Sequence, residues 1–230
     1  MPRHRGTYKP DREEPYEISR SRIEAFLKCP ACFWMDRARG IKFPGIIPFL
    51  LNSATDVLLK KDFDVYREIQ KPHPIMKRYG LEHLVPFAHE NLKKWENSRH
   101  FGASPDYFNI LHEPTNLLFG GGLDDVWLNT KTKELHIVDY KSTSRGMNKE
   151  KTALEKINLD GHYSGAYKRQ MDMYTWIMRR KGFEVSNKGY FLYVNGDKYF
   201  EDGMLNDEGN KAKMMFDVQI IEYIVNTSWI

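Results

Sequence analysis

The 230-residue sequence lacks any long hydrophobic run, contains only two cysteines and carries little excess charge. No segment offers the roughly 18 consecutive apolar residues of a membrane-spanning helix, and the opening MPRHRGTYKP lacks the apolar core of a signal peptide. We therefore expect a cytoplasmic protein without a membrane partner. The net charge of +4 is too small to indicate a nucleic-acid binder by itself.

The two cysteines, Cys29 and Cys32, lie in the segment KCPAC. A structural zinc site needs about four ligands, and no second cysteine pair follows to complete one. One interpretation is a pair of small buried thiols at a helix break made by Pro30. The other is a metal-binding scaffold, which requires more ligands than the sequence supplies.

Length and composition predict one ordered domain. We expect a flexible tail at 1–17, where prolines recur and little could be buried, followed by one domain at 18–230 with a helical insertion at 71–104. A first helix should end at Pro30, with Ser21 and Glu24 as its capping box.

Apolar periodicity predicts a second helix from about residue 52, in which Asp56 falls on an apolar stripe and needs a partner. Alternating patterns then predict strands, and the segment 164–183 predicts a strong helix that ends at Gly182. The expected strands lie at 107–112, 116–129, 134–142 and 188–194.

The expected strand at 134–142 places an acid and a base on one face. Because side chains alternate along a strand, Asp139 and Lys141 share a face with Ile137. If this strand pairs with the preceding one across the turn NTKTKE, Asp124 and Asp139 converge. An ion pair on an edge strand would explain Asp139 and Lys141 alone, but it would not explain the second acid.

Two carboxylates at contact distance repel each other unless one is protonated or a cation bridges them. Mg²⁺ accepts carboxylate and carbonyl oxygens, and Lys141 beside it would stabilise charge on a phosphate. Gly121 and Gly122 would allow close approach of backbone and ligand. Asp125, the next residue, is the alternative to Asp124 as the acid that meets Asp139. These parts together suit phosphodiester hydrolysis.

The motifs resemble the core of the PD-(D/E)XK nuclease superfamily, in particular its RecB-like branch with the CRISPR-associated RecB-like exonucleases. The family's Gly-x-x-Asp, Asp-x-Lys and Gln-x-x-x-Tyr motifs occur in order at 121–124, 139–141 and 170–174. The resemblance implies an α/β fold like that of restriction endonucleases: a central mixed β-sheet flanked by helices, with a helical N-terminal portion.

The resemblance implies a metal-dependent deoxyribonuclease that acts as an exonuclease on DNA ends or single strands. The alternative is a catalytically inactive module that binds nucleic acid or protein. The residues implied in catalysis are Asp124, Asp139, Lys141, Gln170 and Tyr174. The implied ligands of Mg²⁺ or Mn²⁺ are Asp124, Asp139, the Tyr140 carbonyl and Asp56, which stands where relatives often have a histidine.

Cations near the acids would hold the DNA backbone. The candidates are Arg20, Arg22, Arg145, Lys168 and Arg169. Tyr163 and Tyr167 would either stack on unpaired bases or pack against the sheet. Many relatives bind an iron–sulfur cluster through cysteines near both ends, so Cys29 and Cys32 would be cluster ligands only if this chain is a truncated fragment.

Overall fold

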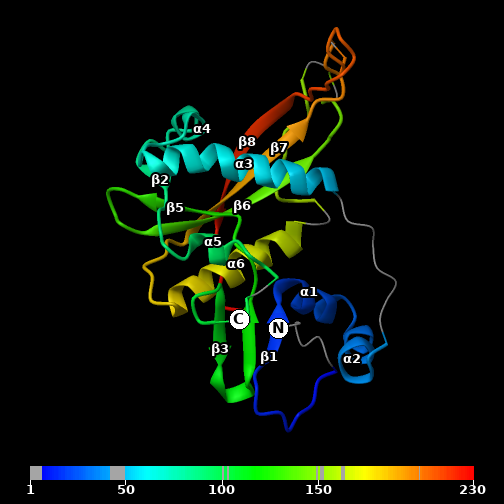
Figure 1. Ribbon diagram of the computed structural model, residues 1–230, viewed down its shortest axis with the longest axis vertical. Coiled ribbons are helices and arrows are strands. Elements are labelled where there is room, and N and C mark those ends of the chain that lie inside the picture. Colours follow the sequence, from blue (N-terminus) through cyan, green and yellow to red (C-terminus); the bar gives the residue numbers. More distant parts are fainter. Residues whose placement is uncertain are drawn as a thin grey trace.

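The computed structural model describes residues 7–41, 50–99, 101–102, 104–148, 150, 153–161, 164–201 and 203–230. The chain is mixed α/β, with two mixed sheets flanked by helices (Figure 1). This arrangement agrees with the expected fold class, except that the strands form two sheets rather than one.

The larger sheet has five strands in the order β2-β5-β6-β7-β8. Strands β6 and β7 are parallel, and the other neighbours are antiparallel. The expected pairing across the NTKTKE turn is confirmed by β5 and β6, which align Asp125 with Val138. The bounds are β2 (Leu84–Pro86), β5 (Asp125–Asn129), β6 (Leu135–Thr143), β7 (Lys188–Gly196) and β8 (Phe216–Ile224).

The smaller sheet has the order β1-β4-β3, with β1 (Tyr16–Ser19), β4 (Leu117–Gly120) and β3 (Asn109–His112). A 3-10 turn, η1 (Glu113–Thr115), joins β3 to β4. Two expectations are wrong here. The segment 116–129 divides into β4 and β5 at its glycines, and residues 16 and 17 of the expected tail belong to β1, because their backbone pairs in parallel with β4.

Four longer helices accompany the sheets in the described part of the chain: α1 (Arg20–Lys28), α2 (Pro30–Arg39), α3 (Leu50–Glu68) and α6 (Ser164–Arg180). Helix α6 ends where its sequence predicted, before Gly182, whose φ of 92° is the left-handed conformation that glycine adopts readily. The positions of α6 buried at helical spacing include Met171, Tyr174 and Ile177.

The expected helical insertion at 71–104 is only partly helical. It contains the short helices α4 (Pro74–Arg78) and α5 (Leu92–Trp95), but also β2, which pairs with β5 as the edge of the larger sheet. Leu84 and Val85 of β2 are buried. The segment is therefore part of the domain core, because its apolar strand completes the sheet.

Helices α3 and α6 cover opposite faces of the larger sheet (Figure 1). Phe63 of α3 is 1% exposed and packs in one cluster with Val138 and Tyr140 of β6. Burial of such a side chain contributes about 1.5–3 kcal/mol. Ile137 of β6 points the other way and packs with Met171 of α6. The alternation predicted for β6 is confirmed.

Candidate active site

The structure brings Asp124 and Asp139 together where β5 and β6 run side by side. Asp124 directly precedes β5, and its Oδ2 accepts a hydrogen bond of 2.8 Å from the backbone N–H of Tyr140 in β6. Asp139 is the residue before Tyr140 and is only 2% exposed. The two carboxyl groups therefore lie at the same end of β5 and β6, within electrostatic reach of each other.

This proximity is electrostatically costly. Burial and the neighbouring Asp139 carboxylate raise the pKa of Asp124 to about 6, although Lys141 and Lys60 oppose the effect. Asp139 Oδ1 is buried without a hydrogen-bond partner among the described residues. An uncompensated buried carboxylate oxygen is unfavourable, so the pair offers a place where a cation would gain favourable contacts.

Lys141 lies within the same group, with a side chain that is 15% exposed. Its ammonium contacts the Asp139 carboxylate and donates a hydrogen bond of 3.3 Å to the Tyr140 carbonyl. The ammonium also lies 4.7 Å from the ring centre of Tyr167 on α6, a cation–π distance. Tyr167 therefore faces Lys141, while Tyr163 lies outside the described residues.

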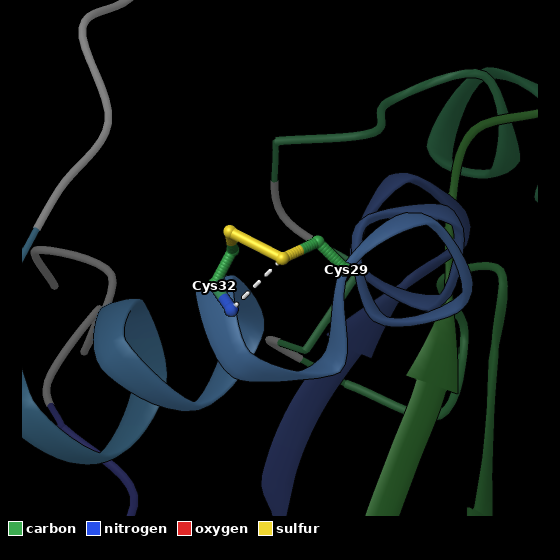
Figure 2. Close-up of a disulfide and its surroundings, with 2 residues drawn as sticks. All are labelled: Cys29 and Cys32. Atoms are coloured by element: carbon green, nitrogen blue, oxygen red, sulfur yellow. Dashed lines mark hydrogen bonds between the residues drawn. A yellow bond between two sulfur atoms is a disulfide. The ribbon is translucent and has the colours of Figure 1, made fainter.

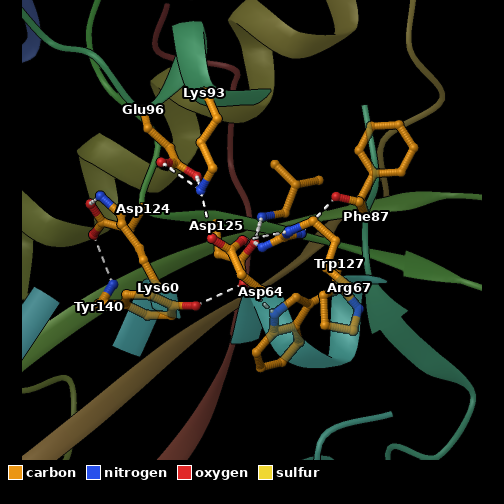
Figure 3. A network of polar contacts seen from close by, with 12 residues as sticks. Lys60, Asp64, Arg67, Phe87, Lys93, Glu96, Asp124, Asp125, Trp127 and Tyr140 are labelled. Carbon is orange, nitrogen blue, oxygen red and sulfur yellow. Dashed lines mark hydrogen bonds and ion pairs between the residues drawn. The ribbon is translucent and has the colours of Figure 1, made fainter. Parts of the chain in front are cut away.

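Asp125, the alternative to Asp124 as the second acid, belongs to a buried hydrogen-bond network. It is fully buried, and it accepts hydrogen bonds of 2.7 Å from Arg67, 3.1 Å from the Trp127 indole and 2.7 Å from the Tyr140 hydroxyl. Figure 3 shows Asp125 within this network, with Asp124 beside Lys60 and the Tyr140 backbone. Both Asp125 oxygens are therefore occupied, and Asp124 is the acid that faces Asp139.

Asp56 approaches the site from α3, but its carboxylate forms an ion pair with Lys60. Lys60, one turn further along α3, donates to Asp56 Oδ2 at 3.0 Å and lies 3.9 Å from Asp124 Oδ1. Burial, and then the Asp124 charge, raise the pKa of Asp56. Burial lowers the pKa of Lys60, but the charges of Asp124 and Asp56 outweigh burial, so the pKa of Lys60 is also raised.

Sequence reasoning missed Lys60. The available signal was its spacing, because an acid and a lysine four residues apart on a helix are close enough to pair. Asp56 alone was recognised as an acid that needs a partner, and Lys60 is that partner. Lys60 therefore adds a second, half-buried ammonium group beside the carboxylate pair.

Among the residues that the structure describes, no group of three or more His, Cys, Asp or Glu side chains is arranged to hold a metal ion. The expected ligand set is therefore reduced, because Asp56 does not form such a group with Asp124 and Asp139. The remaining oxygens that could hold a hard cation are those of Asp124, Asp139 and the Tyr140 carbonyl.

Gln170 and Tyr174 occupy successive turns of α6 and are both buried. Gln170 Oε1 has no hydrogen-bond partner within the described part of the chain. Burial raises the pKa of the Tyr174 hydroxyl to about 12, and this group also responds to the charges of Arg20, Asp124 and Asp139. Tyr174 therefore lies within electrostatic reach of both the first helix and the carboxylate pair.

Other residues of the protein, rather than a ligand, approach the backbone of Gly121 and Gly122 closely. A Cβ on Gly121 would lie 2.8 Å from Cζ of Tyr174, and a Cβ on Gly122 would lie 2.8 Å from the backbone nitrogen of Ser98. Each glycine thus permits a close approach that a larger residue would prevent.

The five cations expected to contact DNA are in different situations. Arg169 forms two hydrogen bonds of 2.7 Å with Glu24, so it joins α6 to α1. Arg145 follows β6, and its backbone N–H donates to Asn195 at 2.8 Å. Lys168 is half-buried on α6. Arg20 and Arg22 line a cavity beside the first turn of α1.

Cys29 and Cys32 form a disulfide bond (Figure 2). Cys29 is the N-cap of α2, and the first helical turn brings Cys32 close to it, with a Cα–Cα distance of 5.3 Å. The backbone N–H of Cys32 also donates a hydrogen bond of 3.2 Å to Cys29 Sγ. The prediction of two buried thiols is therefore wrong. In this state neither sulfur is a free ligand for zinc or an iron–sulfur cluster.

No described helix is both long and apolar enough to cross a membrane. The chain was also compared with known proteins. No family model, no curated protein and no solved structure matches it.

Proposed function

We propose that this protein is a metal-dependent nuclease that hydrolyses DNA phosphodiester bonds on a PD-(D/E)XK-like core. The observation that supports the proposal best is the grouping of Asp124, just before β5, with Asp139 and Lys141 of β6, where Asp139 Oδ1 is buried and has no hydrogen-bond partner among the described residues. A buried acid pair beside a lysine costs stability, so a function in binding a cation and a phosphate would account for it.

The donor set fits a hard divalent ion. Asp124, Asp139 and the Tyr140 carbonyl offer oxygens only, which Mg²⁺ and Mn²⁺ accept, and Mg²⁺ usually keeps several waters in addition to one or two carboxylates. When bound, such an ion would supply Lewis-acid stabilisation of the charge that develops on the phosphate. Asp56 would influence the site through Lys60 rather than as a ligand.

The side chains around the pair would position the substrate. Lys141, held by Asp139 and the Tyr167 ring, would donate hydrogen bonds to a phosphate oxygen and stabilise its negative charge. Gln170 and Tyr174 would orient Lys141 and the strand from α6.

The test is incubation of labelled single-stranded DNA, duplex DNA and RNA with Mg²⁺ or Mn²⁺, comparing the wild type with Lys141→Ala. We expect metal-dependent cleavage that falls by about 10²–10³-fold in Lys141→Ala, the usual effect of removing one charge-stabilising donor. Lys188→Ala is the matched control, because this lysine pairs with Glu222 at 3.0 Å on the neighbouring strands and is half-exposed. Full-rate cleavage by Lys141→Ala would contradict the proposal.

A second candidate is a module that binds nucleic acid or protein without cutting. The absence of a third acidic ligand among the described residues favours it. DNA binding that persists without metal, together with no cleavage under any metal condition, would identify this function instead.

A further inference from the structure

A cavity of about 480 Å³ adjoins the candidate active site. Sites for small molecules commonly have volumes of about 300–1,000 Å³. Its wall includes the end of β1, the first turn of α1 and part of α2 on one side, and Gly121, Gly122 and Tyr174 on the other. The cavity is therefore formed by segments that are far apart in the sequence.

The charge of the lining is strongly positive. Four arginines and a single carboxylate, Glu17, face the cavity, and the arginines are Arg20, Arg22, Arg37 and Arg99. Guanidinium groups gathered in one place repel one another and favour an anion between them. Exposure to solvent alone does not explain why four arginines gather in one concave site.

Two of the arginines are held in place. Asp36 of α2 pairs with Arg22 at 3.0 Å and with Arg37 at 2.6 Å, so one carboxylate serves two cations. Within the described part of the chain, neither Arg20 nor Arg99 forms an ion pair through its side chain. The cavity thus combines two fixed cations with two that are available for a ligand.

Hydroxyl groups and a helix end add to this positive region. Ser19, Ser21 and Ser98 line the cavity. Ser19, rather than the predicted Ser21, is the N-cap of α1, and its side chain does not cap the helix but lies 3.0 Å from the Ser21 hydroxyl. The N-terminal end of α1, which carries a partial positive charge, therefore borders the cavity and adds to the charge of the arginines.

The cavity and the carboxylate pair share a wall. Gly121 and Gly122 line the cavity and lead directly to Asp124. Tyr174 also lines the cavity, and its hydroxyl lies within electrostatic reach of Arg20 on one side and of Asp124 and Asp139 on the other. A group bound in the cavity would therefore be close to a phosphate bound at the carboxylates.

We propose that this arginine cavity binds the phosphate monoester at the end of a nucleic-acid strand, beside the bond that is cut. A monoester carries a charge of about −1.5 to −2 at pH 7, more than the single charge of a backbone phosphodiester, and it presents three strong acceptor oxygens. Arginine forks bind such groups bidentately. The inference rests on the proposed nuclease function, because it names that enzyme's substrate as a phosphorylated strand end.

The test measures binding of short, internally labelled DNA strands by fluorescence anisotropy, in EDTA so that no strand is cut. The strands carry a 5′-phosphate, a 3′-phosphate or neither. We expect the full chain to bind one phosphorylated strand about 10- to 100-fold more tightly than the unphosphorylated one, as charge-assisted hydrogen bonds allow. Inorganic phosphate should compete with that strand alone.

Arg99→Ala should remove most of this preference and leave binding of the unphosphorylated strand almost unchanged. Arg180→Ala is the matched control, because this arginine lies at the exposed end of α6, 4.7 Å from the Trp176 ring centre, outside the cavity. Arg20→Gln serves as the second variant if circular dichroism shows that Arg99→Ala is unfolded.

Equal affinity of the wild type for all three strands would overturn the inference, as would a preference that survives in both Arg99→Ala and Arg20→Gln. If phosphate alone competes with every strand equally, the cavity binds free phosphate and not a strand end, which also overturns it. Adding Mg²⁺ separates the two proposals. Cleavage without any end preference would reject only the cavity, and end preference without cleavage would reject only the nuclease.

Discussion

Replacing Asp124 by asparagine is expected to stabilise the metal-free protein at alkaline pH. The pKa of Asp124 rises from 3.8 to about 6, chiefly through burial and the Asp139 charge. At about 1.36 kcal/mol per pKa unit, ionised Asp124 costs the folded state about 3 kcal/mol. Asparagine removes the charge and keeps an oxygen that can accept the hydrogen bond from Tyr140.

The sign of the pH dependence follows from the raised pKa. Between about pH 4 and pH 6 the folded protein binds more protons at Asp124 than the unfolded chain does. The free energy of unfolding of the wild type therefore falls as the pH rises through this window, and the full cost is present above it. The gain from Asp124→Asn should be near zero at about pH 4 and reach about 3 kcal/mol at about pH 8.

The assay is urea unfolding in EDTA, followed by tryptophan fluorescence across this pH range, with the difference between variant and wild type taken at each pH. Asp125→Asn is the control on the adjacent residue. It should destabilise the protein by about 1–3 kcal/mol, because Arg67 loses one of its two carboxylate partners and keeps only Asp64, at 3.0 Å. An Asp124→Asn protein that is no more stable than the wild type at pH 8 would refute the reasoning.

Two further variants test the packing around the site. Gly121→Ala should destabilise the protein by about 1–3 kcal/mol, because the new methyl group displaces the buried Tyr174 ring, whereas Gly165→Ala on α6 should stabilise it by about 0.5–1 kcal/mol. Urea unfolding measures both, and a tolerated Gly121→Ala would contradict the proposed contact. Arg169→Ala should lower stability by about 1 kcal/mol at low salt, and a double-mutant cycle with Glu24→Gln should show coupling that weakens as salt is added; additive effects would exclude the pair.

The centre of the site could be predicted because it depends on short-range rules. Strand alternation placed Asp139 and Lys141 on one face of β6, and the single turn between β5 and β6 brought Asp124 alongside. The resemblance to the Gly-x-x-Asp motif favoured Asp124 over Asp125. The structure supplies the physical reason, since Asp125 is bound to Arg67 within the core.

The features that the sequence did not predict depend on partners distant in the chain. Tyr16 pairs with Leu117 in the small sheet, and Leu84 pairs with Asn129 in the larger one. Strands of three or four residues are too short for alternation to be recognised, so these segments were predicted as a tail and an insertion. The Cys29–Cys32 disulfide was missed because the same spacing also suits free thiols and metal ligands.

Two lysines offset part of the repulsion between the two carboxylates. Lys60 and Lys141 both lower the pKa of Asp124, yet that pKa remains raised, so the two ammonium groups compensate only part of the cost. The uncompensated part is the free energy that a cation would recover on binding. Asp124→Asn should therefore increase stability in EDTA and abolish the stabilisation that Mg²⁺ gives the wild type. A function in cation binding would keep Asp124 ionisable despite its cost to folding, which packing alone does not explain.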